Sequence, residues 1–113
     1  MKLIVRNTKK SGQVRVFTFK KGKKYISVCL ELDIVKEGSD PEELSLEMME
    51  SVSGHIETVC KANLDDALLN RPAPDVYWKT YSKFLDDQKK SEVKRKADYS
   101  SLSIFPIVDL CPA

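Results

Sequence analysis

Few side chains in this 113-residue chain have the types and spacing that catalysis requires. The sole histidine, His55, lies beside the apolar positions of a segment with helical periodicity. A nucleophile needs a base within hydrogen-bond reach, so catalysis through His55 is not expected. Glu31 and Asp33 share one face of a predicted strand, but two-metal hydrolysis needs further carboxylates from other elements. Residues 1–30 contain no acid to supply them, so we expect no metal site. Since no catalytic constellation is present, we also expect no enzyme and no catalytic residue.

The cysteines also give no clear site. Cys29, Cys60 and Cys111 are odd in number, far apart, and form no Cys-x-x-Cys pair. This pattern excludes a zinc module and disfavours a secreted disulfide scaffold. Cys29 lies on a predicted strand with no neighbouring cation, so a packing role is favoured over a reactive thiol. No glycine-rich phosphate-binding sequence occurs, and we expect no cofactor.

Charge is segregated along the chain, although the net charge is only +2. Residues 1–30 carry nine bases and no acid, whereas residues 31–60 carry nine acids and one base. Such blocks steer charged partners toward different parts of a surface. The basic block has the charges and aromatic rings typical of nucleic-acid binding, and its candidate residues are Arg15, Lys20, Lys21, Lys23 and Lys24. The other interpretation is that both blocks are solvated surfaces.

The first third of the chain predicts antiparallel strands. Residues 3–5 and 14–19 are rich in β-branched and aromatic side chains, and turn-forming residues separate them. Gly22, flanked by lysines, predicts the turn of a second hairpin. Residues 25–32 alternate apolar and polar side chains, which is the period of a strand with one face on a core. Residues 33–37 then predict a short third partner.

A long helix is predicted to begin after Asp40. This residue is suited to cap the helix, Pro41 suits the first helical position, and the acids Glu42 and Glu43 favour the first turn. Apolar residues then recur every three or four positions up to about residue 62. This stripe consists of Leu44, Met48, Val52, Ile56 and Val59. We expect it to cover the sheet.

From about residue 72 the pattern predicts a C-terminal extension. After the rigid joint of Pro72 and Pro74, helical spacing of aromatic residues predicts a second helix that begins near Asp75 and frays through residues 89–96. Apolar residues at 102–108 predict a final strand, and Pro106, which lacks an amide hydrogen, places that strand at an edge. The second helix has an apolar side and the last strand has an unpaired edge, and one small sheet is not expected to cover both. We therefore expect a homo-oligomer.

These elements predict one α+β domain over residues 1–113. It should contain an antiparallel sheet of three to five strands packed against one long α-helix, plus a second C-terminal helix, with the helices on one face. No apolar run reaches the roughly 18–20 residues that a membrane span needs. The first six residues are too short for a signal peptide. We therefore expect no membrane partner and a cytoplasmic location.

Residues 25–44 resemble the N-terminal domain of HicB-like antitoxins. The positions that carry the resemblance are Tyr25, Cys29, Glu31, Leu32, Asp33, Gly38, Glu42, Glu43 and Leu44. Leu30 stands where this family usually has proline. The resemblance implies a β-β-β-α-β domain, described as partial ribonuclease H-like, that blocks a small RNA-cleaving toxin. Many members also carry a C-terminal DNA-binding module, and no pair of short helices around a turn follows Pro74 here.

Two functional hypotheses follow. The first is a non-catalytic HicB-like antitoxin, or a related regulatory protein, that binds and masks a small basic toxin-like partner. Its predicted contact residues are the acids of the long helix, namely Glu42, Glu43, Glu47 and Glu50, whose charge complements such a partner. The alternative is a regulator that binds RNA or DNA through the basic N-terminal hairpin.

Overall fold

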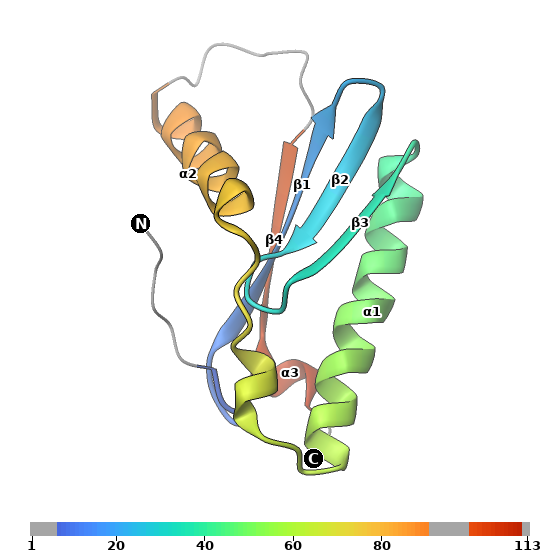
Figure 1. Cartoon of the computed structure of the whole chain (residues 1–113), viewed down its shortest axis with the longest axis vertical. Helices are drawn as coiled ribbons and strands as arrows, with labels where there is room; N and C mark the ends of the chain where they lie inside the picture. The colour runs from blue at the N-terminus through green and yellow to red at the C-terminus, as the bar shows by residue number, and fades with distance from the viewer. Residues whose placement is uncertain (1–6, 91–99, 112–113) are drawn as a thin grey trace.

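The computed structural model describes residues 7–90 and 100–111. Its elements in chain order are β1 (Gln13–Lys21), β2 (Lys24–Cys29), β3 (Ile34–Gly38), α1 (Pro41–Lys61), the 3-10 helix η1 (Asp66–Leu69), α2 (Asp75–Lys90), β4 (Ser100–Pro106) and α3 (Ile107–Leu110). The strands form one antiparallel sheet in the order β3-β2-β1-β4 (Figure 1). This confirms the α+β class, while the strand predicted at residues 3–5 lies outside the described residues.

The β1–β2 hairpin turns where the glycine predicted it. Gly22 has a φ of 65°, which a residue without a Cβ adopts at little cost. Strand β2 is shorter than expected, because it ends at Cys29 rather than continuing to residue 32. There the amides of Leu32 and Asp33 turn back to the Cys29 carbonyl, and Asp33 takes a φ of 56°. The chain then reverses into β3.

Helix α1 follows the sequence prediction closely. It begins at Pro41, and the Asp40 side chain accepts a hydrogen bond from the Glu42 amide at 3.0 Å. All five residues of the predicted apolar stripe are buried. Four of them pack in one cluster with Val14, Val16 and Cys29 of the sheet, namely Met48, Val52, Ile56 and Val59. Each such side chain contributes about 1.5–3 kcal/mol of burial free energy. The stripe therefore fixes α1 on one face of the sheet.

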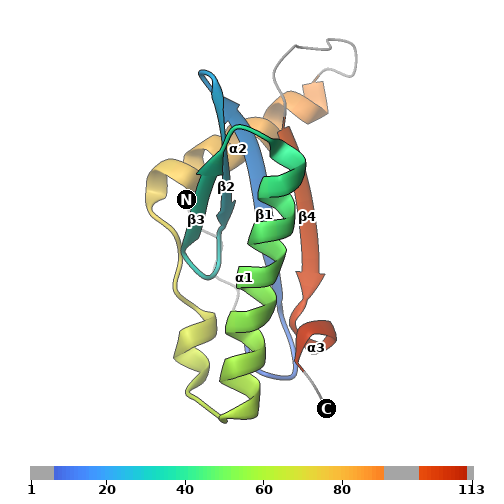
Figure 2. The same ribbon diagram turned by 90° about the vertical axis from the view of Figure 1, so that its right-hand side faces the viewer.

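Helix α2 covers the opposite face, which corrects the expectation that the helices share one face (Figure 2). The physical reason is that both sides of β1 are apolar. Its Val14 and Val16 pack under α1, whereas Phe17 packs with Trp78 and Tyr81 of α2. The Phe17 ring lies 5.6 Å from that of Tyr81, centroid to centroid. The sheet is thus the middle of three layers.

The last strand is an edge strand, as Pro106 predicted. Within residues 7–90 and 100–111, strand β4 pairs with β1 alone, from Gln13 opposite Pro106 to Phe19 opposite Ser100. The apolar pattern overstated its length, because Ile107 and Val108 begin α3 instead of extending the strand. Ile107 is fully buried in the cluster under α1. Helix α3 therefore covers that cluster near the C-terminal end of α1. No helix of the described chain is long and apolar enough to cross a membrane.

Candidate functional site

A buried polar cluster lies between the sheet and α2. The Arg15 Nε donates to Glu31 Oε2 at 2.6 Å, and the Arg15 backbone amide donates to Glu31 Oε1 at 2.7 Å. The guanidinium carbon lies 5.1 Å from the Trp78 ring centroid and 5.3 Å from that of Tyr81. The Tyr81 hydroxyl accepts a longer bond from Arg15 Nη1 at 3.5 Å. One arginine thus joins β1, the turn after β2, and α2.

Burial disfavours the charged forms of both members of this pair, and their mutual attraction favours them. Burial raises the pKa of the Glu31 carboxyl above its ordinary value, and the hydrogen bonds and charge of Arg15 only partly offset this. Burial lowers the pKa of Arg15, but Glu31 and Tyr81 together raise it above its ordinary value. Both Glu31 oxygens accept hydrogen bonds from Arg15, so the buried carboxylate is fully hydrogen-bonded within the protein. We assign the pair a structural role.

The carboxylates considered for metal-assisted hydrolysis do not converge. Glu31 points into the buried cluster, whereas Asp33 is exposed in the turn after β2. Across residues 7–90 and 100–111, no group of three or more histidine, cysteine or acidic side chains is placed to hold a metal ion. The geometry therefore gives no support to a nuclease centre at these positions.

The four predicted lysines lie together at the tip of the β1–β2 hairpin. Lys20, Lys21, Lys23 and Lys24 are all exposed. They extend past the last paired residue of β4, because the β1–β4 register ends at Phe19. Lys24 forms a long, exposed ion pair with Glu37 at 3.4 Å. These side chains form a small basic surface, which we call the lysine tip.

The structure does not bring Arg15 to the lysine tip. Arg15 is only 8% exposed, and its guanidinium is held by Glu31 and by two aromatic rings. The expectation that it contributes to a nucleic-acid surface is therefore wrong. Alternation along β1 explains the error, since it turns Arg15 toward α2 together with Phe17.

The predicted acids of α1 lie on its solvent side. Glu42, Glu43, Glu47 and Glu50 are all exposed, and none of them forms an ion pair within the described part of the chain. Leu46 lies among them and is 69% exposed. Residues three or four apart on a helix are surface neighbours, so Leu46 adjoins Glu42, Glu43 and Glu50. We call these five residues the acidic face.

His55 and Cys29 both have structural roles. The His55 Nε2 lies 2.8 Å from the Leu68 carbonyl oxygen, and this contact ties α1 to η1. Cys29 is fully buried in the cluster under α1. Burial raises the pKa of its thiol to about 12, so the nucleophilic thiolate is scarce at neutral pH.

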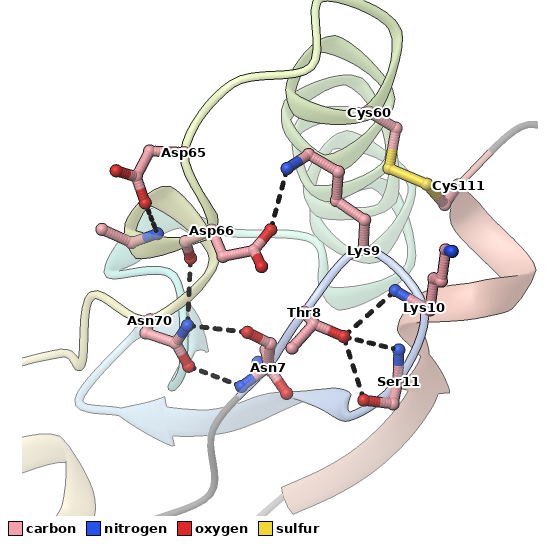
Figure 3. A network of polar contacts seen from close by, with 11 residues as sticks. Asn7, Thr8, Lys9, Lys10, Ser11, Cys60, Asp65, Asp66, Asn70 and Cys111 are labelled. Atoms are coloured by element: carbon pink, nitrogen blue, oxygen red, sulfur yellow. Dashed lines mark hydrogen bonds and ion pairs between the residues drawn. A yellow bond between two sulfur atoms is a disulfide. The ribbon is translucent and has the colours of Figure 1, made fainter.

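The other two cysteines are joined, which the sequence did not predict. A disulfide links Cys60, near the end of α1, to Cys111, just after α3, with a Cα–Cα distance of 5.7 Å (Figure 3). The two residues are 51 positions apart, and they meet because α3 packs against the end of α1. No spacing rule would have identified this pair.

An asparagine pair fixes the same end of the molecule (Figure 3). The Asn7 amide donates to Asn70 Oδ1 at 2.7 Å, and Asn70 Nδ2 donates back to the Asn7 carbonyl at 2.9 Å. Asn7 is fully buried and also bonds the Leu69 carbonyl and the Gln13 amide. Its polar groups are therefore satisfied inside the protein, as expected of a structural residue.

We compared the chain with known families and structures. No family model, curated protein or solved structure matches it. The HicB-like resemblance thus rests on residues 25–44. A function is therefore inferred from the chemistry of two exposed charged surfaces of the described residues, the acidic face and the lysine tip.

Proposed function

We propose that this protein is a non-catalytic binding protein that masks a small basic partner, such as an RNA-cleaving toxin, with its acidic face. The observation that carries the proposal is the arrangement of four exposed carboxylates around the exposed Leu46. An apolar centre with a polar rim is the usual anatomy of a protein interface. Unpaired carboxylates add complementary charge, which accelerates encounter with a basic partner.

The fold agrees with what the resemblance implies. Three strands precede a long helix, and a later strand lies beside β1, as in a β-β-β-α-β domain. Residues that carry the resemblance have scaffold roles here, since Glu31 holds Arg15 and Asp33 forms the turn before β3. Helix α2 is an addition on the other face of the sheet. It leaves the acidic face free for a partner.

The proposal is tested by affinity capture from the cells that encode the chain, followed by reconstitution. The captured protein should be small and basic, should cleave RNA when purified, and should lose that activity when one equivalent of this chain is added. Reversing the charges with Glu42→Lys, Glu43→Lys, Glu47→Lys and Glu50→Lys should weaken binding by about tenfold or more.

The control reverses two exposed acids on α2, with Asp86→Lys and Asp87→Lys, and is compared with the double reversal Glu43→Lys and Glu47→Lys on α1, which changes the net charge equally. This control should bind the captured protein as the wild type does. The proposal fails if no basic partner is recovered, or if the α1 and α2 reversals weaken binding equally.

A second candidate function is RNA or DNA binding through the lysine tip. It is favoured by the clustering of four exposed lysines beyond the end of the β1–β4 pairing. Contacts to phosphates release counterions, so the affinity should fall steeply as salt rises. Fluorescence anisotropy with labelled RNA and DNA measures this, and Lys21→Glu with Lys23→Glu should abolish it. Absence of micromolar binding at low salt would reject this candidate.

A further inference from the structure

The two edges of the sheet differ in how they are protected against pairing. Strand β3 forms one edge and carries the charges of Lys36 and Glu37 within its five residues. Strand β4 forms the other edge, and none of its seven residues is charged. Charged side chains are a common means of preventing unwanted strand pairing at an edge. Only the β3 edge has that protection within the strand itself.

The centre of β4 also presents an apolar side chain to solvent. Ile104 is 49% exposed, although it lies opposite the buried Arg15 in the β1–β4 register. Leu102, two positions earlier and on the same side of the strand, is half-buried and packs on the α2 cluster. Ser103 between them is exposed. In Figure 2 no helix of the described chain runs alongside β4 on its outer side, and α3 follows at the lower end of the strand.

We propose that β4 pairs with β4 of a second copy of this chain, antiparallel, about a twofold axis at Ser103. Opposite residues of antiparallel strands lie on the same face of the sheet. This register therefore sets Leu102 of one copy against the partner's Ile104. Because of the twofold symmetry this contact occurs twice, and it covers the apolar side chains of both copies. The two four-stranded sheets become one continuous sheet.

The pattern of the strand selects a second copy as the occupant. Around Ser103 the order is apolar, polar, apolar, so reading the strand backwards gives the same pattern. An edge of this kind is complementary to itself, which is the requirement for a twofold interface. The same operation on β3 about Lys36 would place Lys36 against the partner's Lys36, and like charges directly opposite are destabilising. The interface leaves α1 uncovered, so it is independent of the proposed function.

The first test is a cysteine cross-link. Directly opposite residues have Cα atoms about 4.5–5.5 Å apart, which lies within the range that a disulfide spans. Ser103→Cys should therefore form a covalent dimer under mild oxidation, visible on a non-reducing gel and lost on reduction. The matched control is Lys36→Cys on the β3 edge. Ser103→Cys should give about tenfold more dimer, because pairing raises the local thiol concentration.

The second test is sedimentation. The wild-type chain should sediment as a dimer, and Ile104→Lys should halve the mass by placing a charge against the partner's Leu102. Val35→Lys, on the exposed part of the β3 edge, should remain dimeric. The proposal is overturned if the wild type is monomeric at the highest concentration reached. It is also overturned if Ser103→Cys and Lys36→Cys cross-link equally, and that result does not depend on how well the lysine variants fold.

Discussion

The two faces of the sheet are built on different principles. Under α1 the layer is mainly aliphatic, with Met48, Val52 and Ile56 packed on the valines of β1. Under α2 it is aromatic and surrounds the Arg15–Glu31 ion pair. The first face depends on a periodicity that lies within one helix. The second depends on residues from three separate segments that meet only in the folded protein.

The difference bears on how each face is stabilised. Aliphatic burial contributes to folding in rough proportion to the area removed from water. A buried ion pair must first overcome the cost of removing two charges from water, and this cost can exceed the attraction between them. The raised pKa of Glu31 indicates that burial has the larger effect on its carboxylate. Since the charge of Glu31 in turn raises the pKa of Arg15, the two effects oppose each other. We expect the pair to position α2 on the sheet more than it stabilises the fold.

The largest expected effect comes from breaking that pair on one side only. Glu31→Ala should lower the free energy of unfolding by about 3–5 kcal/mol, because it leaves the Arg15 guanidinium buried without its partner. Urea denaturation measures the loss, and the fluorescence of Trp78, the only tryptophan, reports the α2 layer.

The control for this prediction removes both charges. Arg15→Met combined with Glu31→Leu should recover most of the lost stability, because apolar residues of similar volume replace the pair. If the double variant is less stable than Glu31→Ala, the ion pair stabilises the fold by itself, and the contrast between the two faces is wrong.

A truncation under α1 tests the other face. Met48→Ala should cost about 3 kcal/mol, from the lost transfer free energy and the cavity left behind. The measurement is again urea denaturation. Combined with Glu31→Ala, it should give a sum of the single losses to within about 0.5 kcal/mol if the faces are independent. A larger coupling would show that the two clusters respond as one.

A smaller effect is expected at the start of α1. Asp40→Ala should cost about 1 kcal/mol, because the Glu42 amide loses its side-chain acceptor. Asp40→Asn, which keeps an oxygen at the cap, should stay near wild-type stability in thermal melts. Equal losses in the two variants would mean that the charge of Asp40, rather than the hydrogen bond, is what matters.

The last prediction concerns how the folding stability changes with pH. The folded-state pKa of Glu31 lies above the ordinary value of 4.5, so the folded protein binds its proton more tightly than the unfolded chain does. The stability due to this group is therefore present below pH 4.5 and lost as the pH rises through the folded-state pKa. Relative to Glu31→Gln, the wild type should lose stability as the pH rises from 4. A relative gain would contradict the burial argument.

Local signals in the sequence predicted much of the fold. The cap at Asp40, the stripe from Leu44 to Val59 and the turn at Gly22 all lie where the pattern placed them. These features depend on neighbours within a few positions, so one sequence contains the information. The acidic face follows from the same helix periodicity. Its role in binding remains a prediction.

The features that the sequence did not predict join distant segments. Arg15 meets Glu31 over 16 positions, Cys60 meets Cys111 over 51, and Asn7 meets Asn70 over 63. Because Arg15 lies near several lysines in the sequence, it is expected to join a basic surface. Only the alternation along β1 and the position of α2 show that its side chain points to the interior. The placement of α2 on the far face likewise required knowing that both sides of β1 are apolar.

The bond between Cys60 and Cys111 has a consequence for the connectivity of the chain. It closes a covalent ring that holds α2 and β4, while β1, β2 and β3 lie outside that ring. A single protease cut anywhere between these cysteines would leave both fragments attached as one molecule. Such a nicked protein would run as a single species until a reducing agent separates the pieces.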